Sequence, residues 1–361
     1  MITPLTRQRF DDLVRVVEGG REGRWLVLTH DNPDPDALAS AAVLARVLEH
    51  RFHRHVTCGY GGIVGRAENR EMVRQLKIPL THLRDLSISD FRRFALVDAQ
   101  PGSGNNQLPK RTTADLVFDH HPRRRTTAGA RFVDIRTDYG ATATMMGEYL
   151  AAAGLEPTRA LATALVYAIR SETQDFLRES AGPDKDLYDH VFPLVDKRAL
   201  AKIQASRLPV DYFRNLHTAL ENLSAVESLV VTHLGVVEQP DIVPEVADLL
   251  LRMEGKTWSL ATGVYGDRVY LSIRTTNARA DAGRIMRQLV ARNGKGGGHG
   301  MLAGGWVAIT PGYAETPRLL QEQLARRLAR SLKKNPEKLQ PIALDAPAAD
   351  ADRPAGDTDG R

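Results

Sequence analysis

Three short, unbroken apolar runs in the first half of the chain constrain the fold most. They are Trp25–Thr29, Phe94–Val97 and Asp115–Phe118. Strands that are covered on both faces of a parallel sheet read as continuous apolar runs of this kind. Helical patterns lie between and after the runs, at 36–49, 66–76 and 141–153. Alternating strands and helices predict an α/β domain with a mostly parallel sheet flanked by helices.

The second half predicts a smaller α+β domain. Apolar runs recur at 228–232, 258–262, 268–274 and 306–309, with helical patterns at 281–292 and 315–334. The end of the chain has almost no large apolar residues, so it cannot offset the entropy cost of ordering and is expected to be disordered. The expected organisation is a first domain at 1–183, a helical connector at 184–225, a second domain at 226–335 and a disordered tail at 336–361.

Composition narrows the class of protein. A length of 361 residues suits roughly two domains. The single cysteine, Cys58, excludes an internal disulfide and indicates a reducing compartment. The N-terminus lacks a signal-peptide core, and no apolar run approaches the roughly 18 residues of a membrane span. We therefore expect a cytoplasmic protein. The net charge of +5 suits an anionic substrate without requiring one.

Acidic and imidazole side chains follow each of the three runs. The first is followed by His30, Asp34 and Asp36, the second by Asp98, and the third by Asp119, His120 and His121. Ligands of open α/β sheets bind beyond the carboxyl ends of the strands, so these side chains are expected to share one site. One His-Asp pair at a strand end is more often a cap or a turn, but three successive clusters favour a functional site.

The clustered carboxylates indicate divalent cations. Crowded carboxylates resist common ionisation, and a bound cation holds them ionised. Aspartate oxygens combined with imidazole nitrogens suit Mn²⁺, Zn²⁺ or Fe²⁺ better than Ca²⁺. Pro33 and Pro35 restrict the backbone of the first loop and would help to place Asp34 and Asp36 before a metal arrives.

These motifs resemble those of the DHH phosphoesterase superfamily. The segment His30-x-x-Pro-Asp-x-Asp36-Ala-Leu, the isolated Asp98 and the triplet Asp119-His120-His121 look like its first three motifs. The run Gly296-Gly-Gly-His299, followed by Ala303-Gly-Gly305, looks like the signature of the accompanying DHHA1 domain. Within the superfamily, the compact remainder of the chain is most similar to the nanoRNase, pAp-phosphatase and soluble cyclic-di-AMP phosphodiesterase group.

The resemblance implies a site with two metal ions. One ion would be held by His30, Asp34 and Asp98, and the other by Asp36, Asp98 and His120. His121 would face the substrate phosphate, while Asp119 would orient a neighbouring imidazole. The fourth motif departs from the family pattern, because Glu172 occupies the position of the usual aspartate. Glu172 is the favoured ligand there, and Asp175 is the alternative.

The second domain is expected to hold the substrate. Backbone N–H groups of a glycine-rich turn can bind phosphate oxygens, so Gly297 and Gly298 are candidate contacts, with His299 as an added donor. Arg274 matches a family arginine that grips the substrate, and its guanidinium can bind phosphate through two parallel hydrogen bonds.

The implied activity is hydrolysis of phosphate esters by hydroxide attack at the two-metal site. Mn²⁺ is the favoured ion, with Mg²⁺ and Co²⁺ as alternatives. The expected partners are small nucleotides or short single-stranded oligonucleotides, with no membrane; a homodimer is left open. Two other functions remain alternatives: a metal-poor, catalytically weakened nucleotide-binding or scaffold protein of the same fold, and a basic nucleic-acid-binding module. The low aromatic content, 6%, argues against the last.

Overall fold

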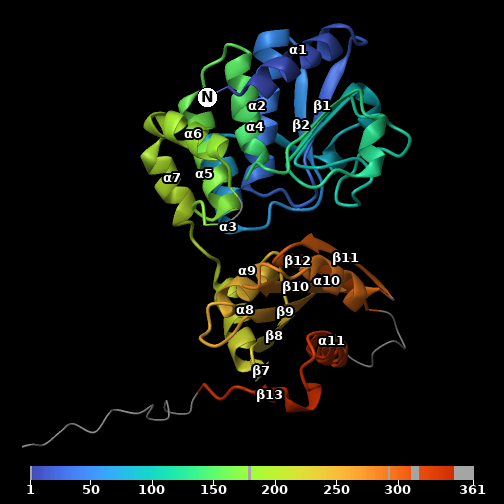
Figure 1. Ribbon diagram of the computed structural model, residues 1–361, viewed down its shortest axis with the longest axis vertical. Coiled ribbons are helices and arrows are strands. Elements are labelled where there is room, and N and C mark those ends of the chain that lie inside the picture. Colours follow the sequence, from blue (N-terminus) through green and yellow to red (C-terminus); the bar gives the residue numbers. More distant parts are fainter. Residues whose placement is uncertain (1, 178–179, 292, 310–316, 345–361) are drawn as a thin grey trace, which may run out of the picture. The chain divides into compact units, whose positions relative to one another are not determined.

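The computed structural model describes residues 2–177, 180–291, 293–309 and 317–344 (Figure 1). The chain divides into two compact units. The first unit ends at Arg207, and the second begins at Leu208. The boundary therefore falls inside the helical stretch at 184–225 that the sequence marks as a connector.

The first unit is built on a six-stranded sheet in which every strand pair is parallel. The strand order is β3-β2-β1-β4-β5-β6, so the direction of winding reverses between β1 and β4. The three predicted runs form β1, β4 and β5, while β2, β3 and β6 lie on less apolar sequence. The strands are β1 (Arg24–Leu28), β2 (Val56–Tyr60), β3 (Leu80–His82), β4 (Phe91–Val97), β5 (Leu116–Asp119) and β6 (Phe132–Ile135).

Seven α-helices and four short 3-10 turns accompany this sheet in the described part of the unit. The predicted helices at 36–49, 66–76 and 141–153 correspond to α2, α3 and α4. The helices are α1 (Pro4–Glu18), α2 (Pro35–Phe52), α3 (Ala67–Leu76), α4 (Thr142–Ala152), α5 (Arg159–Thr173), α6 (Gly182–Val191) and α7 (Lys197–Gln204), and the 3-10 turns are η1 (Leu83–Asp85), η2 (Ile88–Asp90), η3 (Arg125–Gly129) and η4 (Phe192–Leu194).

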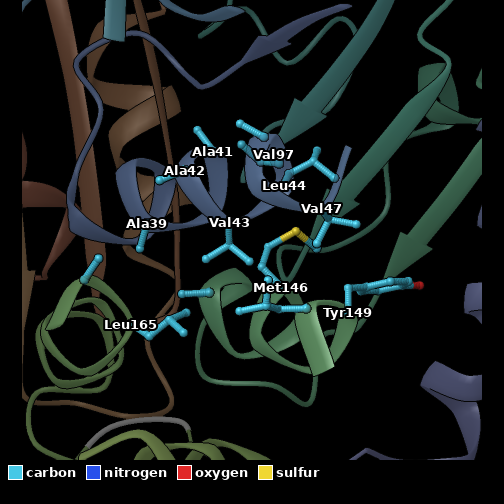
Figure 2. Packing of buried hydrophobic residues seen from close by; sticks show 14 of the residues in the cluster. Ala39, Ala41, Ala42, Val43, Leu44, Val47, Val97, Met146, Tyr149 and Leu165 are labelled. Carbon is cyan, nitrogen blue, oxygen red and sulfur yellow. The ribbon is translucent and has the colours of Figure 1, made fainter. Parts of the chain in front are cut away.

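Helix α2 forms the centre of the core. Asp34 caps its N-terminus and Pro35 occupies its first turn, a combination that satisfies one free N–H and presets the first backbone angle. Its small residues let α4 and α5 approach closely, and most of its length is buried. Figure 2 shows Val43 and Leu44 of α2 in the cluster that also includes Met146 of α4 and Leu165 of α5. The rigid first turn of α2 carries Asp36.

The second unit contains a seven-stranded mixed sheet, in the order β11-β12-β10-β9-β8-β7-β13. Among the described strands of this second sheet, only the β8–β9 pair is parallel. The predicted smaller α+β domain is confirmed. The strands are β7 (Ser224–Val226), β8 (Leu229–Val236), β9 (Trp258–Tyr265), β10 (Arg268–Thr275), β11 (Gly294–His299), β12 (Leu302–Ala308) and β13 (Gln340–Pro341).

Helices cover both faces of this second sheet. Residues of α8 (Val210–Glu221) and α9 (Ile242–Leu250) form one apolar cluster with the sheet. Residues of α10 (Ala282–Val290) and α11 (Pro317–Ser331) form another cluster. Each face therefore has its own core.

The glycine run does not form the turn expected from its sequence. Residues 294–299 form the edge strand β11, which pairs with β12. Glycine is needed here for packing, because a Cβ on Gly296 would lie 2.7 Å from Met286 Cγ and a Cβ on Gly283 of α10 would lie 1.9 Å from the Gly298 carbonyl oxygen. The glycines allow α10 to lie directly against this edge of the sheet.

The start of the predicted disordered tail is ordered. Residues 336–338 form a 3-10 turn (η5, Pro336–Lys338), and β13 pairs with β7. Leu339 packs against one apolar cluster and Ile342 against the other. These contacts offset the entropy cost of ordering the segment, which composition alone could not show. The rest of the predicted tail, 345–361, lies outside the described residues.

None of the described helices is both long enough and apolar enough to span a bilayer.

Candidate metal centre

The candidate site lies at the carboxyl ends of three adjacent strands of the first unit. Strand β4 pairs with β1 on one side and with β5 on the other. The chain leaves β1 toward His30, β4 toward Asp98 and β5 toward His120. The winding reversal between β1 and β4 is the position at which open α/β sheets bind ligands. The shared location expected from the strand-end clusters is thus observed.

Asp98 lies between three imidazoles. Its Oδ2 is 3.4 Å from His30 Nε2, and its Oδ1 is 3.7 Å from His120 Nε2 and 3.5 Å from His121 Nδ1. The Asp98 backbone is left-handed, with φ of 52°, a conformation that Asp and Asn adopt more readily than most residues. This turn at the end of β4 directs the carboxylate toward the neighbouring strand ends. Asp98 can therefore be shared between two ligand groups.

Backbone carbonyls determine which nitrogen of two imidazoles faces Asp98. His30 Nδ1 donates a hydrogen bond to the Asp31 carbonyl oxygen at 2.9 Å, and His120 Nδ1 donates to the Tyr139 carbonyl oxygen at 3.2 Å. A carbonyl oxygen can only accept, so Nδ1 carries the hydrogen in both rings. The Nε2 lone pairs are left for another partner. Metal-bound histidines commonly show this arrangement.

The residues present fit a divalent cation. His120 Nε2 is buried and has no hydrogen-bond partner within the described part of the chain. It faces Asp98 Oδ1 at 3.7 Å and Asp36 Oδ2 at 3.9 Å, which is too far for a hydrogen bond. An unpaired buried nitrogen between two carboxylates is costly unless a cation completes the group.

Ligand atoms converge in two groups that share Asp98. His30, Asp34 and Asp98 form one group, and Asp98, His120 and His121 form the other, with the atoms of each group within 4.8 Å of one another. The first group is the set implied by the family resemblance. In the second group His121 stands beside His120, where the resemblance implies Asp36.

Both oxygens of Asp36 accept backbone hydrogen bonds. Thr142 N donates to Oδ2 at 2.8 Å, and Ala143 N donates to Oδ1 at 2.6 Å. The hydroxyl of Thr142 donates to Asp98 Oδ1 at 3.1 Å. The first residues of α4 therefore hold two of the predicted ligands at once.

Asp119 orients His121. Its Oδ1 accepts hydrogen bonds from the backbone N of His121 at 3.0 Å and from the ring Nδ1 at 2.9 Å. Its Oδ2 accepts a hydrogen bond from Gln100 at 2.7 Å. The ring is thereby held with Nε2 on its far side. This geometry suits the expected role of Asp119 as the residue that positions a neighbouring imidazole.

Burial and neighbouring charges shift the pKa values of Asp36 and Asp98 in opposite directions. Burial, followed by repulsion from Asp98, Glu172 and Asp34, raises the pKa of Asp36 well above its usual value. Burial acts in the same direction on Asp98, but hydrogen bonds with His121 and His30 hold its pKa well below the usual value. The protein alone thus contains more buried negative groups than its imidazoles can balance, which is the electrostatic setting of a cation site.

The imidazoles of His121 and His30 bind protons more tightly in this setting. Burial lowers the pKa of His121, but Asp119 and Asp98 together raise it to about 11. Burial also opposes protonation of His30, but the carboxylates of Asp34 and Asp98, 3.7 and 3.4 Å from its Nε2, raise the pKa of His30 well above its usual value.

Glu172, the departure in the fourth motif, belongs electrostatically to the centre. Burial, followed by repulsion from Asp34 and Asp98 and partly offset by His120 and His121, raises its pKa to about 7. The alternative residue, Asp175, pairs with Arg170 and keeps 61% of its side chain exposed. Burial and coupling to the centre therefore favour Glu172 over the exposed Asp175 as the candidate ligand.

The predicted substrate residues of the second unit lie on its sheet. Arg274 Nε donates to Asp248 Oδ1 of α9 at 2.7 Å, and its Nη1 donates to Ser272 Oγ at 2.6 Å. Its side chain is 11% exposed, so much of the guanidinium is engaged inside the unit. The backbones of Gly297, Gly298 and His299 lie in β11. The side chain of His299 lies outside what the structure describes.

Sequence reasoning missed several residues that support the centre. Gln100 and Thr142 bind predicted site residues directly, and Asp184 binds the segment that precedes α4. The signal for Gln100 is its place two residues after Asp98 at a strand end. The signal for Thr142 is its position at the start of a buried helix. Asp184 has no local signal for this role, because Thr144 and Gly140 lie 40 and 44 residues away.

Comparison with known proteins agrees with this architecture. Residues 24–169 match the DHH family, N-terminal domain, and residues 227–322 match the DHHA1 domain. An uncharacterized protein of Methanocaldococcus jannaschii is 33% identical over 284 residues, which cover 78% of this chain and 57% of that protein. The A-adding tRNA nucleotidyltransferase of Geobacter sulfurreducens is 26% identical over 64% of this chain and 27% of that enzyme. The chain thus spans little more than half of one curated relative and about a quarter of the other.

A solved structure shares the fold. An exopolyphosphatase-related protein from Bacteroides fragilis has a TM-score of 0.71 at 14% sequence identity, covering 91% of this chain and 98% of that one.

Proposed function

Since the chain belongs to the DHH family and carries a DHHA1 domain, we propose that it is a metal-dependent phosphoesterase acting on small nucleotides or short single-stranded oligonucleotides. The observation that carries the proposal is Asp98, a single carboxylate shared by two groups of nitrogen and oxygen ligands. Two-metal phosphoesterases need such a bridging group to hold their ions close together. The finer substrate choice includes pAp, dinucleotides, cyclic-di-AMP and short single-stranded DNA.

The chain's residues have distinct roles in this proposal. His30, Asp34 and Asp98 would hold one divalent ion, and His120 with Asp98 would hold the other. Asp36 and Glu172 are the proposed further ligands of the second set, because Asp36 Oδ2 lies 3.9 Å from His120 Nε2 and Glu172 is electrostatically coupled to Asp34 and Asp98. When bound, a pair of such ions neutralises charge on phosphate oxygens and lowers the pKa of water. Mn²⁺ is the preferred ion, with Mg²⁺ or Co²⁺ as alternatives, because the donor set mixes carboxylate oxygen with imidazole nitrogen.

His121 provides the contact to the phosphate. Its Nδ1 donates to Asp119 Oδ1, which fixes the ring, and Nε2 is the proposed donor to a phosphate oxygen. The hydrogen bond and charge of Asp119 favour the protonated ring, which has the charge that a phosphate requires. The backbone of β11, together with Arg274, is the proposed substrate contact of the second unit.

Asp98→Asn tests the proposal. Asparagine tolerates the left-handed backbone at this position and removes the shared negative charge. We expect hydrolysis of a short phosphodiester with saturating Mn²⁺ to fall by about 1000-fold or more, as for a change at the reacting centre. Wild-type turnover by this variant would overturn the mechanism.

Metal content gives an independent measurement. Close to two ions per chain in the purified protein supports the enzyme, and a content near zero supports the scaffold alternative. A panel of the four named substrates with Mn²⁺, Mg²⁺ and Co²⁺ then identifies the preferred pair.

A further inference from the structure

The segment 139–144, which leads into α4, contacts three of the predicted metal ligands. The Tyr139 carbonyl accepts a hydrogen bond from His120 Nδ1. The backbone N–H groups of Thr142 and Ala143 donate to Asp36. The hydroxyl of Thr142 donates to Asp98. Every one of these contacts depends on where the backbone of the segment lies. The position of segment 139–144 therefore affects ligands of both metal groups.

Asp184 holds this segment from the opposite side. Its Oδ2 accepts a hydrogen bond from Gly140 N at 2.8 Å, and its Oδ1 accepts one from Thr144 Oγ1 at 2.5 Å. The two hydrogen bonds fix the segment near both of its ends. Asp184 is 0% exposed, so water cannot replace either hydrogen bond.

Capping of α6 does not account for these contacts. Asp184 also accepts from Ala181 N at 2.6 Å, as expected of an acidic residue in the first turn of a helix. That bond uses one lone pair of one oxygen. The other two bonds cross 40 and 44 residues of sequence and reach only segment 139–144. Burying a carboxylate has a desolvation cost. An exposed side chain could cap the helix without that cost.

We infer that Asp184 is a positioning residue for the metal centre: by fixing segment 139–144, it sets the tautomer of His120 and the orientations of Asp36 and Asp98. Within the described part of the chain Asp184 makes no hydrogen bond to these ligands, and it acts through Gly140 and Thr144. The inference rests on the proposed function in one respect only, namely that the ligands bind a cation.

The test measures Mn²⁺ affinity of the full-length chain by isothermal titration calorimetry. Asp184→Asn keeps the size of the side chain but removes its charge and one of its two acceptor oxygens, so the hydrogen bonds with Gly140 N and Thr144 Oγ1 become weaker. We expect Mn²⁺ affinity to fall by about 10- to 100-fold, the usual effect of changing a residue that supports metal ligands. Thr144→Val removes one of the two contacts and should weaken affinity in the same direction, whereas Thr144→Ser should retain it.

A double-variant experiment on Asp184 and Thr144 separates a positioning role from a general loss of stability. If both variants act through segment 139–144, the double variant Asp184→Asn/Thr144→Val loses less affinity than the product of the two single losses. Asp115→Asn is the matched control. It makes the same substitution at another buried aspartate of the first unit, one that pairs with Arg93 and Arg131 rather than with segment 139–144. It should lower thermal stability and leave Mn²⁺ affinity within about twofold.

The outcomes are distinguishable. If wild-type protein binds Mn²⁺ and both Asp184→Asn and Thr144→Val bind it equally well, Asp184 has a structural role only and the inference is overturned. If the wild type itself binds no divalent ion, the proposed function fails and the inference fails with it. If Asp184→Asn does not fold, the Mn²⁺ affinities of Thr144→Val and Thr144→Ser test the inference on their own.

Discussion

The amide nitrogen of Gln100 donates a hydrogen bond to Asp119 Oδ2 at 2.7 Å, and both side chains are buried. The carbonyl oxygen of the same amide accepts from Arg124 N and from Thr127 Oγ1. One side chain thus connects the end of β4 with Asp119 and with the loop after His121.

Gln100→Leu should therefore impair catalysis more than metal binding. It leaves Asp119 Oδ2 without its donor and loosens His121, the proposed phosphate contact. We expect kcat/KM to fall by about 10- to 100-fold while Mn²⁺ affinity changes by less than about threefold. Steady-state kinetics and calorimetry measure the two effects. Gln75→Leu, at a glutamine whose amide donates a hydrogen bond to Glu71 on α3, is the control. If Mn²⁺ affinity fell as much as kcat/KM, the prediction would be wrong, and Gln100 would support the metal ligands instead.

Gly297→Ala should raise KM without destabilising the second unit. A Cβ added at Gly297 meets nothing within 4 Å, whereas one at Gly296 meets Met286 at 2.7 Å. If the substrate approaches the backbone of β11, the added methyl group blocks that approach, and we expect KM to rise about tenfold or more with metal affinity unchanged. Gly296→Ala should instead lower the melting temperature, since it overpacks the core by roughly 1–3 kcal/mol. An unchanged KM for Gly297→Ala would contradict the substrate role of this strand.

The second unit should lose stability in mild acid through His233. Burial lowers the pKa of His233 to about 4, from about 6.5 in an unfolded chain. The unfolded state therefore binds more protons between these values, so the stabilising contribution is complete above about pH 6.5 and is lost as the pH falls toward 4. The full difference is on the order of 3 kcal/mol.

Denaturant unfolding of the full chain, followed at several pH values between 4 and 7, measures this slope. His233→Gln should remove most of it, because glutamine does not titrate. His217→Gln, at a histidine with 73% of its side chain exposed, should leave the slope in place. A slope that survives in His233→Gln would assign the acid sensitivity to other groups.

Cys58 should not react in the native protein. It is 2% exposed, and burial raises its pKa to about 12, so the thiolate fraction at pH 8 is on the order of 10⁻⁴. Iodoacetamide at pH 8 should leave the folded chain unmodified and label it fully in denaturant, as measured by mass spectrometry. Rapid labelling of the folded protein would indicate that the region around β2 opens readily.

The sequence predicts the centre of the first unit better than its edges. Strands β1, β4 and β5 are buried on both faces, so their apolar runs and the ligands that follow them can be read directly. Strand β3 is only partly buried, and its sequence carries no such run. The parallel pairing of the strands then brings His30, Asp98 and His120 together without further information.

Features that depend on distant packing could not be predicted. The glycine run suggests a turn when read locally, but the close approach of α10 makes it an edge strand. From the sequence, Arg274 is predicted to bind phosphate. In the structure its Nε donates a hydrogen bond to Asp248, which lies 26 positions away on a helix. Asp184 reads as an ordinary helix-start residue, because segment 139–144 is adjacent only in the folded chain.

The Nδ1 hydrogen bonds of His30 and His120 have a consequence for how the centre responds to acid. Main-chain oxygens do not titrate, so acidification can add a proton to either ring but cannot exchange the nitrogen that faces inward. A ring that gives up the added proton, to solvent or in exchange for a cation, should therefore be ready to bind without a slow reorientation step. A centre built in this way would recover from transient acid exposure as fast as protons leave it.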